Sequence, residues 1–123
     1  MKLNKRAFGS SGEQRAIEYL KSSGYEIITV NYRYGRLGEI DIIARDGEYI
    51  CFVEVKTRSS TAYGTPAEAV TRRKQDRIKK LAQIFISQNS LYDINMRFDI
   101  IEIFISKDIN GSASYINLIK NAF

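Results

Sequence analysis

The feature that most constrains this chain is a segment that reads EIDIIARDGEYICFVEVKTR, from Glu39 to Arg58. Two runs rich in isoleucine, valine and phenylalanine flank an Asp-Gly pair, which is typical of two antiparallel strands joined by a tight turn. Such strands bury at least one face, yet these carry Asp41, Glu54 and Lys56. Polar residues inside an apolar strand pattern usually serve a function. The segment therefore predicts a sheet with a polar site on it.

The register of this hairpin decides which polar side chains meet. We take Asp46-Gly47 as the two turn residues, so that Arg45 pairs with Glu48. Side chains alternate between faces along a strand, so this register places four polar residues on one face. These are Glu39, Asp41, Glu54 and Lys56. In this arrangement Asp41 and Glu54 become diagonal neighbours within reach of one shared ion.

Three carboxylates on one patch repel one another. A pair of like charges at ~4 Å costs about 4 kcal/mol at an effective dielectric constant near 20. An exposed salt bridge to Lys56 returns only about 0–1 kcal/mol. A divalent cation would balance the charge, and ligands that are all oxygen atoms suit Mg²⁺ or Mn²⁺. The alternative is a solvated sheet edge with a surface ion pair, and the hairpin alone does not decide between the two.

Composition excludes several kinds of chemistry. The chain has no histidine, which excludes Ser-His-Asp and Cys-His nucleophiles and Cys/His zinc sites. The one cysteine, Cys51, cannot form an internal disulfide and suits a reducing compartment. A net charge of +5 favours a polyanionic partner, and no apolar run approaches the roughly 20 residues that span a bilayer. We expect one cytoplasmic domain over residues 1–123, with residues 1–9 as a flexible basic arm and no membrane partner.

The remaining pattern predicts the order of the elements. Gly24 is expected to end the first helix, and Thr65-Pro66 has the composition of a helix start. The expected helices cover residues 10–23 and 66–88, the second either continuous or with a break, and the expected strands cover residues 25–33, 37–45, 48–57, 96–105 and 114–119. The order α-β-β-β-α-β-β predicts an α/β fold in which a mixed sheet is flanked by helices.

The first expected helix adds an acidic candidate to the hairpin. At 100° per residue, Glu13 lies on the same inward stripe as Ile17 and Leu20. It also stands three residues after Ser10, the spacing of a capping box. Capping and a role in the site explain Glu13 equally well at this point.

The second expected helix adds basic candidates. Its buried stripe is defined by Ile78, Leu81 and Phe85, and Lys74 falls on that stripe near the helix start. The other basic residues of the helix flank the stripe; they are Arg72, Arg73, Arg77, Lys79 and Lys80. A solvated helix face is the ordinary explanation for such a charge run. Combined with the acidic hairpin, a phosphate-binding wall is the better hypothesis.

These segments together resemble a known family. GEIDII followed by FVEVKTR resembles the PD-(D/E)xK nuclease signature, and GSSGEQRAIEYLKSSGY resembles the helix that precedes it. With TPAEAV and RFDIIEI, the likeness covers nearly the whole chain and is closest to the YraN family of small bacterial proteins, grouped with endonucleases and related in fold to archaeal Holliday junction resolvases. Ile40 stands where the signature has proline. The resemblance implies a restriction-endonuclease-like fold.

The same resemblance implies metal-assisted hydrolysis of DNA phosphodiester bonds. Asp41 and Glu54, with the backbone carbonyl of Val55, would hold Mg²⁺ or Mn²⁺, and Glu13 would bind the metal directly or through water. Lys56 would orient the attacking water and stabilise the growing negative charge. The residues expected to hold the nucleic-acid backbone are Arg36, Arg58, Arg72, Arg73, Lys74, Arg77, Lys79 and Lys80.

Two other functions compete with hydrolysis. The first is a non-catalytic DNA- or RNA-binding module that retains the nuclease fold. The second is a protein-interaction domain, which would show neither cleavage nor salt-sensitive binding of nucleic acid. If the substrate is a Holliday junction, its two-fold symmetry calls for a homodimer, and the apolar segment over residues 96–119 would supply the interface.

Overall fold

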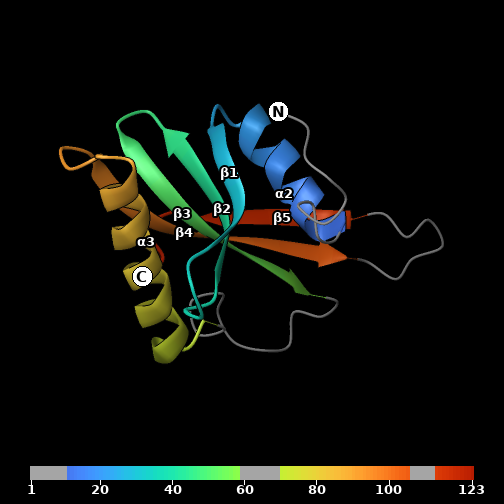
Figure 1. The fold of residues 1–123 in the computed structure, drawn as a ribbon. Helices are drawn as coiled ribbons and strands as arrows, with labels where there is room; N and C mark the ends of the chain where they lie inside the picture. Colours follow the sequence, from blue (N-terminus) through green and yellow to red (C-terminus); the bar gives the residue numbers. More distant parts are fainter. Residues whose placement is uncertain (1–10, 59–69, 106–112) are drawn as a thin grey trace.

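The computed structural model describes residues 11–58, 70–105 and 113–123, which form one five-stranded sheet and two helices (Figure 1). In chain order the elements are α2 (Ser11–Ser22), β1 (Glu26–Arg33), β2 (Glu39–Asp46), β3 (Tyr49–Arg58), α3 (Arg72–Gln88), β4 (Asn95–Ile105) and β5 (Ala113–Ile119). This order confirms the expected α-β-β-β-α-β-β arrangement. Residues 1–9, expected to form a basic arm, and the expected helix start at Thr65-Pro66 lie outside the described residues.

The strands follow one another across the sheet in the order β1-β2-β3-β4-β5. Neighbouring strands are antiparallel except β3 and β4, which are parallel. A parallel pair needs a long crossover, and α3 lies within that connection. Lys74, in the first turn of α3, contacts Glu54 in the second half of β3. The sheet is therefore mixed, as expected.

Each face of the sheet is covered by one helix, and Figure 1 shows α2 and α3 on opposite sides. The central strand β3 alternates accordingly: Phe52 packs among the residues that contact α3, and Val53 among those that contact α2. Cys51 is fully buried on the α2 side, so its thiol is part of the core. The predicted helix stripes are also confirmed; their buried residues are Ala16, Ile17 and Leu20 on α2 and Ile78, Leu81, Ala82 and Phe85 on α3.

The two helix ends that bound the core follow from local chemistry. Gly24 has a φ of +94° and ends α2, because the Tyr25 N–H donates to the Leu20 carbonyl and the Gly24 N–H to the Lys21 carbonyl. At the start of α3, the Thr71 hydroxyl accepts a hydrogen bond from the Lys74 N–H. Neither described helix is long and apolar enough to cross a membrane.

The hairpin between β2 and β3 corrects the predicted register. Arg45 pairs with Ile50 rather than with Glu48, and the turn residues are Gly47 and Glu48 rather than Asp46 and Gly47. Gly47 has a φ of +59°, and a glycine at the first central position is what a type II′ turn favours. The true register differs from the predicted one by an even number of residues, so it leaves the face of each side chain unchanged.

Candidate active site

The site begins where β2 and β3 separate. Their described pairing ends at Ile42 and Val53, although β2 starts three residues earlier, at Glu39. Beyond that point a side chain takes part in the hydrogen bond between the strands: the Val55 N–H donates a hydrogen bond to Asp41 Oδ2 at 2.8 Å. This bond fixes the Asp41 carboxylate between the two strands.

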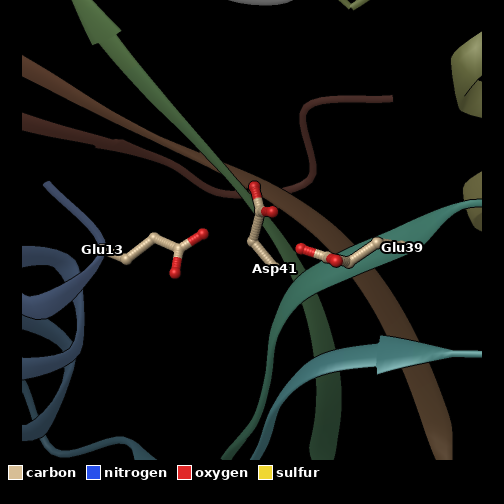
Figure 2. A group of neighbouring side chains, drawn as sticks. All are labelled: Glu13, Glu39 and Asp41. Carbon is tan, nitrogen blue, oxygen red and sulfur yellow. The ribbon is translucent and has the colours of Figure 1, made fainter. Parts of the chain in front are cut away.

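Three carboxylates meet at this opening. Glu13 extends from α2 and Glu39 from β2 toward Asp41, which lies between them (Figure 2). One oxygen atom from each of the three lies within 4.8 Å of the others. All three side chains are half-buried. The opening between β2 and β3 therefore brings together acids that come from a helix and a strand.

Two of these acids are held by polar neighbours. Arg33 Nη2 lies 2.6 Å from Glu39 Oε2, and Arg33 Nε donates to the same oxygen at 2.7 Å. Glu13 accepts a hydrogen bond from the side chain of Asn31. Asn31 lies inside β1 with a φ of +52°, a left-handed conformation that asparagine tolerates better than most residues. The local irregularity of β1 therefore aims this side chain at Glu13.

Glu54 lies next to this group on the side of the sheet that α3 covers. Lys74 Nζ is 2.6 Å from Glu54 Oε1, and the Glu54 side chain is only 5% exposed. Glu54 Oε2 is buried and has no hydrogen-bond partner among the described residues. A buried carboxylate oxygen without a partner costs free energy, so this atom has unused capacity to bind a cation or a donor. We refer to Glu13, Glu39, Asp41 and Glu54 as the carboxylate cluster.

The cluster shifts the proton affinity of its members. Desolvation, reinforced by the negative charge of Glu54, raises the pKa of Asp41 to about 7. Desolvation and the charge of Glu39 also raise the pKa of Glu13. Both shifts mean that the ionised acids are held apart from water and close to like charge. Such an arrangement is destabilising by itself and is relieved by a bound cation.

Two lysines face the cluster and differ in their proton affinity. Burial, together with the positive charge of Lys74, lowers the pKa of Lys56. Burial acts in the same direction on Lys74, but its hydrogen bond to Glu54 and the negative charge of Glu54 outweigh it and raise the pKa of Lys74. Lys56 is therefore the lysine that loses its proton first.

The structure brings the predicted metal and catalytic residues into one region. Asp41 and Glu54 are electrostatic neighbours, Lys56 and Glu13 interact with the same group, and the Val55 backbone contacts Asp41. The expectation that the hairpin polar residues all share one open face is wrong. Glu54 interacts with α3, whereas Asp41 also meets Glu13 of α2. The separation of β2 from β3 allows contact from both sides.

The basic residues expected to bind nucleic acid fall into two groups. Those with a partner in the structure include Lys74 at Glu54, Arg58 at the buried Glu102 (2.9 Å) and Arg72 at Asp76 (3.7 Å). Lys79 lies over the aromatic rings of Phe98 and Phe123. The Arg58 side chain is only 13% exposed, so its charge is directed mainly at the sheet. The remaining expected residues are exposed and have no ion-pair partner among the described residues; they are Arg36, Arg73, Arg77 and Lys80.

Two residues of the site were missed by the sequence reasoning as candidate ligands or supports. Glu39 was placed on the hairpin patch but was not assigned to the metal, although its spacing from Asp41 already put both on one side of the strand. Asn31 gave no signal, because nothing in the sequence shows that β1 adopts a left-handed conformation there.

The donor set fits a hard divalent cation. Every side-chain ligand that the cluster offers is a carboxylate oxygen, and no histidine or cysteine thiol takes part. Mg²⁺ and Mn²⁺ prefer such ligands and complete their shells with water, which the half-exposed position of the cluster admits.

Comparison with known proteins places this chain in a family. The model of the uncharacterised protein family UPF0102 matches residues 12–103. A UPF0102 protein of Acetivibrio thermocellus is 54% identical over 123 residues, which cover 99% of this chain and 95% of the relative. The chain belongs to UPF0102. A UPF0102 protein of Caldicellulosiruptor saccharolyticus is 46% identical over 98% of this chain and its own full length. One of Clostridium botulinum is 48% identical over 94% of this chain and 92% of its own length.

UPF0102 is the family to which the sequence resemblance pointed under the name YraN. The residues that its model matches contain the whole carboxylate cluster and both lysines that face it.

Proposed function

We propose that this protein is a metal-dependent nuclease that hydrolyses phosphodiester bonds in DNA. The observation that carries the proposal is the convergence of Glu13, Glu39 and Asp41 within 4.8 Å beside a buried Glu54 oxygen that has no partner among the described residues. Acids gathered at such a cost are expected where a cation has to be held. The likeness of GEIDII and FVEVKTR to the PD-(D/E)xK signature supports the same conclusion.

The carboxylate cluster would hold Mg²⁺ or Mn²⁺, with the carbonyl of Val55 as a further candidate ligand. The metal would supply a Lewis acid for the phosphoryl oxygens and an activated water at neutral pH. Asp41 is oriented for binding by the Val55 N–H, and Glu39 by Arg33. Because their carboxylates must be ionised to bind, the raised pKa values of Asp41 and Glu13 make metal affinity increase with pH.

Lys56 would exchange a proton and stabilise negative charge during the reaction. Its lowered pKa lets it exchange a proton with an attacking water more readily than an ordinary lysine. In its protonated form it would stabilise the negative charge that grows on the phosphate. Lys74, which neutralises Glu54 here, lies close enough to contribute positive charge to the same phosphate.

A nucleic acid is favoured as substrate by the positive charge beside the carboxylate cluster. The first turn of α3 carries Arg72, Arg73 and Lys74 and no acidic residue, where the helix dipole adds positive potential of its own. A net charge of +5 favours polyanions in general. The sequence resemblance to Holliday junction resolvases would favour branched DNA, and resolving a junction would require two copies of this single-site domain.

A cleavage panel tests the proposal. The full chain is incubated with Mg²⁺ or Mn²⁺ and with single-stranded, duplex, flap and four-way-junction DNA, beside an Asp41→Asn variant. We expect cleavage of at least one substrate, dependent on metal and lost in the variant. Light scattering with and without junction DNA tests the homodimer; a strict monomer in both conditions excludes junction resolution but not nicking or flap cutting.

The same panel separates hydrolysis from the competing functions. Binding without cleavage, equal in the wild type and in Asp41→Asn, would indicate the non-catalytic nucleic-acid-binding module. If neither cleavage nor salt-sensitive binding occurs with any DNA or RNA, a protein-interaction domain becomes the better explanation.

A further inference from the structure

A cavity of about 280 Å³ lies beside the carboxylate cluster, between the loop that follows β1 and the N-terminal half of α3. Its lining residues are Leu37, Gly38, Glu39, Thr71, Arg73, Lys74, Arg77, Ile78 and Leu81. Two of these connect it to the site already described: Glu39 belongs to the carboxylate cluster, and Lys74 contacts Glu54. Whatever occupies the cavity therefore lies next to the candidate metal site.

The lining is divided by chemistry. Leu37 is half-buried, and Ile78 and Leu81 are almost fully buried, so they form an apolar floor. Arg73 and Arg77 are exposed at the rim, and neither has an ion-pair partner within residues 11–58, 70–105 and 113–123. The single acid among the described lining residues, Glu39, has Arg33 as its counterion at 2.6 Å. The cavity thus offers an apolar surface below uncompensated positive charge.

We propose that this cavity binds one unpaired nucleotide of a nucleic-acid strand, with the base on the apolar floor and the adjoining phosphates at Arg73 and Arg77. The inference rests on the proposed function for the nature of the ligand and adds the class of substrate. A small anion would leave the apolar floor unused, and an apolar ligand would leave the arginines unused. The volume suits one small group rather than a base pair. The nuclease would then act where a strand is single or locally unpaired.

Binding of fluorescein-labelled oligothymidylate tests this, in buffer with a chelator so that no hydrolysis occurs. The matched probes are an abasic strand of the same length, which keeps every phosphate, and a blunt duplex. A base held on the apolar floor should make the oligothymidylate bind at least about fivefold more tightly than the abasic strand. Equal affinity for these two probes would overturn the proposal, because only the phosphates would then be bound.

Variants locate the interaction. Arg77→Gln should weaken binding of every strand and reduce the slope of log affinity against log salt by about one. Arg45→Gln makes the same chemical change at an exposed position of β2 outside the cavity and should leave the slope unchanged. Leu37→Glu should abolish the preference for a base. Leu37→Ala, which shortens the floor without adding charge, gives the same test if the glutamate variant does not fold.

Two outcomes distinguish this inference from the proposed function. Metal-dependent cleavage without any preference for unpaired nucleotides would leave the nuclease standing and overturn the cavity proposal. A base preference that depends on Leu37 and Arg77, in a protein that cleaves nothing, would support the cavity proposal and overturn hydrolysis.

Discussion

Two aspartates on the same strand, Asp41 and Asp46, lie in opposite electrostatic surroundings. Asp41 sits among like charges, and desolvation raises its pKa to about 7. Asp46 accepts a hydrogen bond from Arg97 and lies near Lys120, and the hydrogen bond from Arg97 lowers its pKa. One strand of the sheet therefore carries an acid that the fold destabilises and an acid that the fold stabilises.

Almost all of the polar groups around Asp46 have hydrogen-bond partners within the protein. Asp99 is fully buried, and both of its oxygens accept hydrogen bonds from the Arg97 guanidinium, at 2.9 Å each. The Asn121 N–H and the Tyr25 hydroxyl donate to the same carboxylate, at 2.9 and 3.4 Å. We call Asp46, Asp99, Arg97, Tyr25 and Lys120 the arginine cluster. It ties β2, β4 and the segment after β5 together.

The difference between the arginine cluster and the carboxylate cluster indicates which buried acids are structural and which are functional. In the arginine cluster the hydrogen-bond capacity is filled by the protein, which indicates a structural role. In the carboxylate cluster four acids face two lysines and Arg33, and one buried oxygen has no partner among the described residues. Unfilled capacity of this kind is expected at functional sites, where a ligand completes it.

The largest expected effect is on stability, and it contrasts the two clusters. Asp99→Asn removes the fully buried one of the two counterions of Arg97 and should lower the free energy of unfolding by about 3–5 kcal/mol. Asp41→Asn removes a repelled charge and should leave the stability of the metal-free protein unchanged or increased. Urea titration of both variants measures this. If Asp41→Asn lowered the free energy of unfolding as much as Asp99→Asn, the proposed difference between the two clusters would be wrong.

The next effect is the pH dependence of stability without metal. Because the pKa of Asp41 is raised, the native state holds a proton that the unfolded state releases, so stability falls as pH rises from about 4 to about 7, by up to about 4 kcal/mol. Glu13 acts with the same sign. The pKa of Asp46 is lowered, so its contribution is lost only as pH falls below about 4.

Thermal unfolding across this pH range, in wild type and Asp41→Asn, checks the sign. In the variant, stability should change less between pH 4 and 7. The loss of stability below about pH 4, to which Asp46 contributes, should remain. An identical curve for the two proteins would show that Asp41 titrates normally.

Lys56→Ala should reduce cleavage by about 10²–10³-fold while DNA affinity stays within a few-fold, because its charge acts on the transition state. Lys120→Ala, the lysine of the arginine cluster, should leave cleavage unchanged. Single-turnover rates and filter binding separate the two effects. If Lys56→Ala unfolds the protein and activity per folded molecule is unchanged, the role of Lys56 is structural rather than catalytic.

Metal should stabilise the native protein through the carboxylate cluster alone. At a metal concentration about 100 times the dissociation constant, the gain is about 2.7 kcal/mol. Asp41→Asn should lose this gain, and Asp46→Asn should keep it. Melting curves with and without Mn²⁺, supported by calorimetry, measure it. Equal metal binding by wild type and Asp41→Asn would remove the proposed site.

The smallest effect concerns Lys74, which both neutralises Glu54 and lines the cavity. Lys74→Gln should reduce the salt slope of DNA binding by about one. Lys120→Gln, its counterpart in the arginine cluster, should not change the slope. An unchanged slope for Lys74→Gln would mean that this lysine serves Glu54 only.

The sequence by itself determined the order of the elements, because alternation and helical periodicity are written into neighbouring residues. It also placed Asp41, Glu54 and Lys56 on one hairpin and Ile78, Leu81 and Phe85 against the sheet. The misplaced turn did not change which residues lie on the hairpin, and it shifted the register by two residues, so the shift alone did not exchange the faces of the two strands.

Only the tertiary structure decided which charges meet. The separation of β2 from β3 beyond the Ile42–Val53 pair is a feature of the assembled sheet that the alternation of residues along the strands does not predict. The same holds for the pairing of Glu54 with Lys74 and of Arg97 with Asp46, because each pair joins distant parts of the chain. Local sequence sets which face a side chain occupies, whereas the balance of charge within a few ångströms is a property of the assembled sheet and helices.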